Sequence, residues 1–175
     1  MRIGVTGANG FVGGYLLAVL KDAGHQVTAL VRSPADLDQA AVHETVTIPT
    51  IDGTTDKTVL EAAFKGLDCI VHLAARVHVM DAQLDDELFT DVNVAGSACV
   101  YEAAQAAGVK RVVFLSSVKA AGEHSGQRPL TIDDPPAPED AYGRSKLAAE
   151  KHLGAMAAGS GCKLVVLRPA FVYGW

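Results

Sequence analysis

The sequence has few of the features that mark secreted, membrane-spanning or disulfide-stabilised proteins. Its three cysteines, Cys69, Cys99 and Cys162, are odd in number and widely spaced, so we interpret them as reduced packing residues. No apolar run approaches the roughly 18 residues that a bilayer-spanning helix needs. The N-terminal MRIGVTG enters a strand within two residues, which leaves no room for a signal peptide. We therefore expect a cytoplasmic protein without a membrane segment.

The sequence also lacks an excess of positive charge. It has 15 basic and 20 acidic residues, a formal net charge of −5, and no basic run. This balance argues against partners such as nucleic acid or an anionic membrane surface. The histidines His72, His78 and His124 have no partner at metal-ligand spacing, so we expect no metal site.

What is present is a regular alternation of apolar strands and amphipathic helices. Helical patterns begin at Phe11 and cover residues 34–39 in part, 56–66, 85–107 and 141–158. Strands are expected at residues 2–6, 25–32, 42–49, 68–75, 110–117 and 162–169. This order predicts an α/β fold, a doubly wound parallel sheet of order 3-2-1-4-5-6, with its ligand crevice between strands 1 and 4. We interpret residues 1–175 as one dinucleotide-binding domain.

A glycine-rich turn joins the first strand to the first helix. In VTGANGFVG, residues 5–13, Gly7 can form the tight turn, Gly10 lets the backbone approach a diphosphate, and Gly13 allows close packing of helix on strand. The free N–H groups of the helix favour an anion. The alternative is a tight turn with glycines for geometry alone. The candidate cofactor contacts of this turn are Gly7, Asn9, Gly10, Phe11, Val12 and Gly13.

The end of the second strand bears on the choice of cofactor. An acidic residue there would hold the ribose hydroxyls of NAD, but the strand ends LVRSP. Arg32 and Ser33 could instead bind a 2′-phosphate, the arginine through its planar guanidinium. We therefore favour NADP over NAD. The alternative is a solvated arginine after an edge strand.

The segment AYGRSK, residues 141–146, places Tyr142 and Lys146 on one face of a helix. A free phenol ionises near pH 10, too high for a base at neutral pH, but a neighbouring ammonium could lower its pKa by roughly one to three units. Tyr142 could then act as a general base, and in its protonated form as an acid. Ser117, at the end of the fifth strand, could bind the reacting oxygen, and Ser116 is the alternative. Taken alone, such a Tyr/Lys pair is more often structural.

Four motifs together resemble the extended short-chain dehydrogenase/reductase family. They are TGANGFVG, HLAA (72–75), SS (116–117) and YGRSK (142–146). LAARVHVM (73–80) and PPAPEDAYGRSK (135–146) are similar to a subgroup of UDP-hexose 4-epimerase-like proteins and 4-keto-sugar nucleotide reductases. The resemblance implies an NAD(P)-dependent enzyme that transfers hydride at the 4-carbon of a nucleotide sugar. It matches Ser117, Tyr142 and Lys146 to the family's catalytic residues.

The resemblance adds further candidates. It implies that Asn93, in DVNVAG, helps to order Lys146, although an ordinary polar helix position is the alternative. It makes Asp52 the candidate for the acid near the adenine amino group. Apart from the resemblance, we interpret His72, His78 and His124 as packing or loop residues, with Lys119 and His124 as alternative candidates for substrate contacts. The remaining candidate cofactor contacts are Leu73, Ala74, Ala75, Ser116, Tyr142, Lys146 and Pro169, with Lys146 expected to hold the nicotinamide ribose.

The chain also departs from the family pattern. Many relatives carry asparagine at the position of Phe171, and relatives continue beyond the sixth strand into a lobe that grips the nucleotide sugar. We expect that lobe to be absent here, in a truncated product or a naturally short protein, with exposed apolar surface that encourages self-association. The resemblance implies a homodimer. The alternatives to a nucleotide-sugar enzyme are an NADP-binding module without turnover, as a remnant or redox sensor, and a reductase of small ketones.

Overall fold

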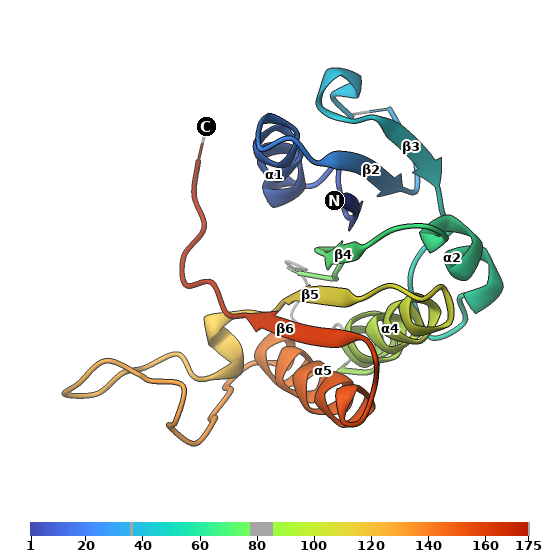
Figure 1. Ribbon diagram of the computed structural model, residues 1–175. Coiled ribbons are helices and arrows are strands. Elements are labelled where there is room, and N and C mark those ends of the chain that lie inside the picture. The colour runs from blue at the N-terminus through green and yellow to red at the C-terminus, as the bar shows by residue number, and fades with distance from the viewer. Residues whose placement is uncertain (36, 78–85, 175) are drawn as a thin grey trace.

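A computed structural model describes residues 1–35, 37–77 and 86–174, and it contains one parallel sheet (Figure 1). The order β3-β2-β1-β4-β5-β6, with every neighbouring pair parallel, confirms the predicted doubly wound topology. The strands are Arg2–Thr6 (β1), Gln26–Val31 (β2), Glu44–Thr47 (β3), Cys69–His72 (β4), Arg111–Leu115 (β5) and Lys163–Leu167 (β6). Each strand lies inside its predicted range, usually shorter by one or more residues.

Helices cover both faces of this sheet. Helix α1 packs on β1 and β2 from one side, whereas α2, α4 and α5 pack on the other side (Figure 1). The α-helices are Phe11–Asp22 (α1), Lys57–Phe64 (α2), Asp86–Phe89 (α3), Ser97–Ala106 (α4) and Ala141–Ala157 (α5). Among the described residues, no helix has both the length and the apolar character that a membrane crossing requires.

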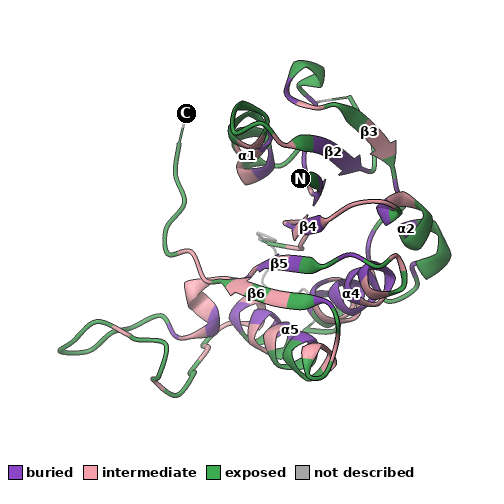
Figure 2. Ribbon diagram, viewed as in Figure 1, coloured by how far each residue is buried: buried purple, intermediate pink, exposed green. Residues whose placement is uncertain are grey.

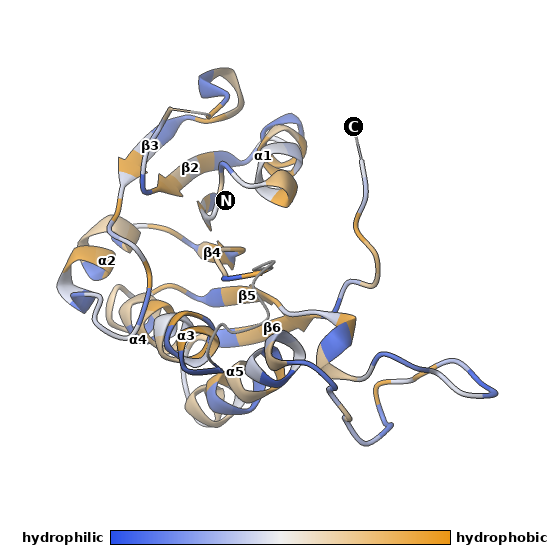
Figure 3. Ribbon diagram, turned by 180° about the vertical axis from the view of Figure 1, so that it is seen from behind, coloured by the Kyte–Doolittle hydropathy of each residue, from blue (hydrophilic) through white to orange (hydrophobic). Residues whose placement is uncertain are grey.

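Two separate cores follow from the alternation of side chains along the strands. Ile70 and Phe114 point toward α2, α4 and α5 and join a core that includes Tyr101. Val5 and Leu17 belong to the second core, beneath α1. The central strands β1, β2 and β4 are correspondingly mostly buried, whereas the edge strands β3 and β6 are intermediate or exposed (Figure 2). Hydrophobic segments recur along the strands (Figure 3).

The second face is less completely covered than the first. In the register of the parallel strands, Val5, Val113 and Val165 lie level with one another across the sheet. Their side chains therefore all point to the α1 side. At the edge strand β6, Val165 is 37% exposed and Leu167 is 48% exposed. The chain after β6 continues past the N-terminal end of α1 as an exposed tail (Figure 2).

Two helical predictions differ from the structure. The helix expected over residues 85–107 is an α–π–α run, in which the π-helical segment Thr90–Gly96 (η2) separates α3 from α4; Asp85 lies outside the described residues. The partial helix expected over residues 34–39 was wrong. A 3₁₀ turn forms instead at Gln39–Ala41 (η1), because the Asp38 carboxylate accepts the Ala40 N–H and starts the turn there.

Candidate active site and cofactor cleft

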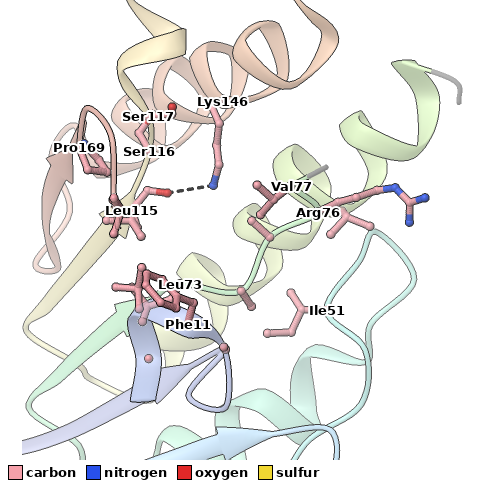
Figure 4. A pocket seen from close by; sticks show the side chains of 18 of the residues that line it. Phe11, Ile51, Leu73, Arg76, Val77, Leu115, Ser116, Ser117, Lys146 and Pro169 are labelled. Atoms are coloured by element: carbon pink, nitrogen blue, oxygen red, sulfur yellow. Dashed lines mark hydrogen bonds between the residues drawn. The ribbon is translucent and has the colours of Figure 1, made fainter. Parts of the chain in front are cut away.

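A cavity of about 970 Å³ lies where the strands end (Figure 4). Its walls come from residues that follow the carboxyl ends of all six strands, the edge at which ligands bind in open α/β sheets. The contributing segments are residues 7 and 9–13 after β1, Arg32 after β2, 48–51 after β3, 73–77 after β4, 116–119 after β5 and 169–172 after β6. The topology therefore gathers into one cavity segments that lie far apart in the sequence.

The glycine turn has the geometry that a diphosphate site requires. Gly7 has φ +67°, and a Cβ there would lie 2.8 Å from the backbone nitrogen of Ala74. A Cβ on Gly13 would lie 2.5 Å from the carbonyl oxygen of Ala8, so only glycine allows α1 to begin this close to β1. The turn is closed by a 3.0 Å hydrogen bond from Gly10 N–H to the Gly7 carbonyl.

Helix α1 begins at this turn with an N-terminus suited to an anion. Gly10 is the N-cap and has no side chain with which to cap the first-turn N–H groups. Those groups and the helix dipole favour a phosphate placed in the cavity. The residues present therefore fit the diphosphate of a dinucleotide. All six candidate residues of the turn line the cavity: Gly7, Asn9, Gly10, Phe11, Val12 and Gly13.

The end of the cavity formed by β2 and β3 agrees only in part with the sequence-based candidates. Arg32 lines the cavity, but Ser33 and Asp52 are not among the described residues that do so. The Ser33 hydroxyl accepts the N–H of Ala35. Asp52 accepts hydrogen bonds from Thr54, which lower the pKa of its carboxyl group. Residues 48–51, which the sequence-based reasoning did not identify, form this wall instead.

A buried hydrogen-bond chain ties the glycine turn to β4. The Thr6 hydroxyl accepts the N–H of Ala74 at 3.3 Å and contacts His72 Nδ1 at 2.7 Å, while His72 Nε2 lies 3.0 Å from the Ser97 hydroxyl. Both ring nitrogens of His72 therefore have a hydroxyl partner. Burial lowers the pKa of His72 to about 3, so the ring is neutral. His72 is thus a packing residue, as expected; His78 lies outside the described residues.

Helix α5 presents the candidate catalytic side chains to the other wall. The helix starts at Ala141 because the Asp140 carboxylate accepts the Gly143 N–H at 2.6 Å. Tyr142 and Lys146 therefore lie in its first two turns, and both line the cavity together with Ser116 and Ser117. The Ser117 side chain lies beside the Tyr142 phenol and lowers its pKa. The structure thus brings these four candidates together.

Lys146 is buried in an apolar site behind Tyr142. It is 2% exposed, and its ammonium donates a 2.9 Å hydrogen bond to the Leu115 carbonyl (Figure 4). The ammonium also lies 4.7 Å from the centre of the Phe114 ring and 5.8 Å from that of Tyr142. Burial lowers the pKa of Lys146 to about 8, within reach of neutral pH.

The direction of the Tyr142 pKa shift is opposite to that predicted from the sequence. Burial raises the pKa of the phenol, and the Asp140 carboxylate adds to this, while the hydrogen bond with Ser117 and the Lys119 cation act against it. The Lys146 ammonium is directed at the Leu115 carbonyl and the Phe114 ring, so it does not lower the pKa as the helical spacing had suggested. A protonated phenol therefore faces the cavity.

Asn93 acts at a distance from the cavity. It is buried in the π-helical segment and does not belong to the described lining residues. Its side chain accepts the Arg76 N–H at 2.8 Å and donates to the Arg76 carbonyl at 3.0 Å and to the Ser145 hydroxyl at 2.9 Å. Ser145 in turn donates to the Tyr142 carbonyl at 2.8 Å. Asn93 thus joins the loop after β4 to the first turn of α5.

Several contacts in and beside the cavity had no signal in the motifs. Lys119, weighed as a substrate contact, lines the cavity and forms a 2.6 Å ion pair with Asp140, whereas His124 lies on the exposed loop before α5. Leu73, Ala74, Ala75 and Pro169 line the cavity as expected. The pairing of Glu150 with Ser116 and Arg168 was missed. Its one trace in the sequence is the spacing of four residues from Lys146 to Glu150.

Within the described parts of the chain, no group of three or more His, Cys, Asp and Glu side chains could hold a metal ion.

Comparison with characterised proteins agrees with this geometry. The family model of the NAD dependent epimerase/dehydratase family matches residues 3–175. A UDP-glucose 4-epimerase from Vibrio cholerae is 38% identical over 174 residues, which make up 97% of this chain and 51% of the relative. The chain thus spans about half the length of the curated relatives it matches.

Solved structures show the same likeness. A UDP-glucose 4-epimerase from Thermotoga maritima, in complex with UDP-glucose, superposes with a TM-score of 0.85 at 28% identity, covering 99% of this chain and 57% of that one. The UDP-glucose 4-epimerase of Thermus thermophilus, in complex with NAD, gives a TM-score of 0.82 at 29% identity, covering 96% and 54%. Together with the glycine turn and the doubly wound sheet, these matches confirm the resemblance seen in the sequence: the chain belongs to the NAD dependent epimerase/dehydratase family.

Proposed function

We propose that residues 1–175 bind a nicotinamide dinucleotide and contribute to hydride transfer at the 4-carbon of a nucleotide sugar. One observation carries the proposal: a single cavity holds a phosphate-binding turn on one wall and the Ser117–Tyr142–Lys146 group on another. The relatives that are UDP-glucose 4-epimerases support the nucleotide-sugar substrate.

Each residue of that group has a distinct proposed role. The bound nicotinamide supplies a hydride acceptor or donor for the sugar carbon. Ser117 hydrogen-bonds the reacting oxygen and orients it toward Tyr142. Tyr142 transfers the proton between that oxygen and its own phenol. Lys146 holds the cofactor ribose. The phenolate that remains after proton donation is stabilised by Ser117 and the Lys119 cation, the two groups that lower the pKa of Tyr142.

The protonation of Tyr142 bears on the direction of the reaction. Since burial raises the pKa of this phenol, Tyr142 is prepared to donate a proton to a 4-keto oxygen. That is the step of a 4-keto-sugar reductase, and also the second half of a 4-epimerisation. A 4-epimerase requires in addition that the cofactor stay bound while the 4-keto sugar rotates and presents its opposite face to the nicotinamide.

Arg32 supports a preference for NADP as a second proposal. Arg32 lines the cavity after β2, where no acidic residue is present to hold the ribose hydroxyls of NAD. The family is named for NAD, and the Thermus thermophilus relative contains NAD. Separate titrations with NADPH and NADH decide between them: tighter binding of NADPH supports the role of Arg32, and tighter binding of NADH refutes it.

Turnover is tested separately from cofactor binding, because the chain spans about half the length of its relatives. The chain is incubated with NAD and UDP-glucose, and UDP-galactose is measured by proton NMR; a second reaction with NADPH and a UDP-4-keto-hexose is followed by nicotinamide absorbance. We expect product in one of the two reactions.

The matched control for turnover is Tyr142→Phe. This variant should lose activity by a factor of about 100 or more and keep its cofactor affinity, because only the phenolic hydroxyl is removed. Cofactor binding with neither product formed would establish the alternative, a dinucleotide-binding module without turnover. Undiminished activity of Tyr142→Phe would refute the role given to Tyr142.

A further inference from the structure

The end of β5 and one face of α5 are joined residue by residue. The Leu115 carbonyl accepts a hydrogen bond from the Lys146 ammonium, and Ser117 lies beside the Tyr142 phenol and lowers its pKa. Between them, the Ser116 hydroxyl donates to the Glu150 carboxylate. The three residues of α5 are spaced by four, so they form a single row along the helix. Two of them belong to the proposed catalytic group, and the third, Glu150, has no role in it so far.

Glu150 is itself held from a third element. The side chain of Arg168, just after β6, donates its Nε–H to Glu150 Oε1 at 2.9 Å and its Nη2–H to Oε2. This two-point contact fixes the plane of the carboxylate as well as its position. The Glu150 side chain is only 9% exposed, and Ser116 is 2% exposed. A carboxylate so thoroughly bonded and buried has little freedom to move.

The surroundings of Lys146 give this carboxylate an electrostatic role. The described ionisable groups that face the ammonium are Tyr142 and Glu150 on α5 and the neutral His72 on β4, with Arg168 behind Glu150. Burial disfavours the ammonium, and among these described groups Glu150 is the anion that opposes this effect. The remaining contacts of the ammonium are the Leu115 carbonyl and the Phe114 ring.

We propose that Glu150 is a positioning residue: clamped by Arg168, its carboxylate fixes Ser116 beside the catalytic row and keeps the buried ammonium of Lys146 charged. Through Ser116 it sets the strand end that carries Ser117. Its catalytic consequence rests on the proposed function, whereas the charge on Lys146 can be measured without any cofactor.

The test is a titration of Lys146 by NMR in the full chain labelled with ¹³C-lysine, with Lys146→Arg used to assign the signal. Glu150→Gln keeps the shape and removes the charge, so the titration midpoint should fall by about one pH unit. Arg168→Gln leaves the carboxylate uncompensated, so the midpoint should rise. The control Glu102→Gln removes an exposed carboxylate that pairs with Lys57 and should leave the midpoint unchanged.

The opposite signs separate electrostatic positioning from a merely structural role. General loosening of the site would raise the titration midpoint of Lys146 in both variants, toward the ordinary pKa of lysine, and that outcome overturns the proposal. An unchanged midpoint in Glu150→Gln overturns it as well. Circular dichroism confirms folding; if Glu150→Gln does not fold, Arg168→Gln and Arg168→Lys decide together, since the proposal requires the midpoint to rise in the first and to stay in the second, whereas general loosening raises both.

A second readout links the proposal to the cofactor. At pH 7 the lowered midpoint leaves about half of the Lys146 side chains charged in Glu150→Gln, so NADPH affinity should fall by roughly a factor of two and recover at pH 6. Loss that persists at pH 6 argues against the charge effect. If the midpoints shift as expected but no dinucleotide binds to the wild-type chain, the positioning role stands and the proposed function fails.

Discussion

Gly7 is the position at which the fold and the cofactor site depend most directly on one residue. Its φ of +67° costs a residue with a Cβ about 1–2 kcal/mol. The added Cβ would also lie 2.8 Å from the backbone nitrogen of Ala74, which cannot rotate away, and such overpacking costs about 1–2 kcal/mol more. We expect Gly7→Ala to lower the free energy of unfolding by roughly 2–4 kcal/mol and Tm by roughly 5–15 °C.

The same substitution should damage the cofactor site, because relief of the clash moves the turn away from β4. We expect NADPH affinity, measured by nicotinamide fluorescence, to fall at least about tenfold, which corresponds to about 1.4 kcal/mol. The matched control is Gly14→Ala in α1, where an added Cβ meets nothing within 4 Å. That variant should gain about 0.5–1 kcal/mol of stability and bind cofactor normally. Equal effects of the two substitutions would refute the reasoning.

Three further predictions follow from buried or charged groups. His72 has a pKa of about 3 in the folded state and its ordinary pKa in the unfolded state, so its contribution to the free energy of unfolding is complete above pH 6.5 and falls below that pH. Urea denaturation should therefore show a loss of about 2 kcal/mol between pH 7 and pH 5, and a constant free energy of unfolding would contradict the neutral ring. Arg32→Ala should weaken NADPH at least about tenfold and leave NADH affinity within about twofold, and equal losses in parallel titrations would exclude a 2′-phosphate contact. Asn93→Ala leaves the Arg76 backbone groups and Ser145 without their partner, so we expect the free energy of unfolding, measured with heat or urea, to fall by roughly 3 kcal/mol. A fall of less than about 1 kcal/mol would count against this linkage.

The features that the sequence predicted correctly rest on local patterns. Alternating strands and helices are enough to give the parallel sheet and its order, because crossover handedness leaves few alternatives. The glycine turn is recognisable because Gly7 and Gly13 occupy positions that no other residue fits. The spacing of Tyr142 and Lys146 likewise places both on one face of α5.

The features that were missed depend on tertiary contacts. The π-helical segment around Asn93 is held by the backbone of Arg76, and no periodicity within residues 90–96 encodes that contact. The raised pKa of Tyr142 follows from burial and from the orientation of Lys146 toward Leu115, which helical spacing alone does not specify. Asp52 was chosen by position in a motif, whereas its carboxylate is engaged by the threonines that follow it.

The central claim is that the cavity at the carboxyl ends of the strands accepts a nicotinamide dinucleotide, with its diphosphate at the glycine turn and its nicotinamide beside Tyr142. Titration of the chain with NADPH and NADH, read by nicotinamide fluorescence, tests this most directly. Saturable binding of one dinucleotide per chain is predicted. A signal that rises linearly without saturation for both dinucleotides would contradict the account.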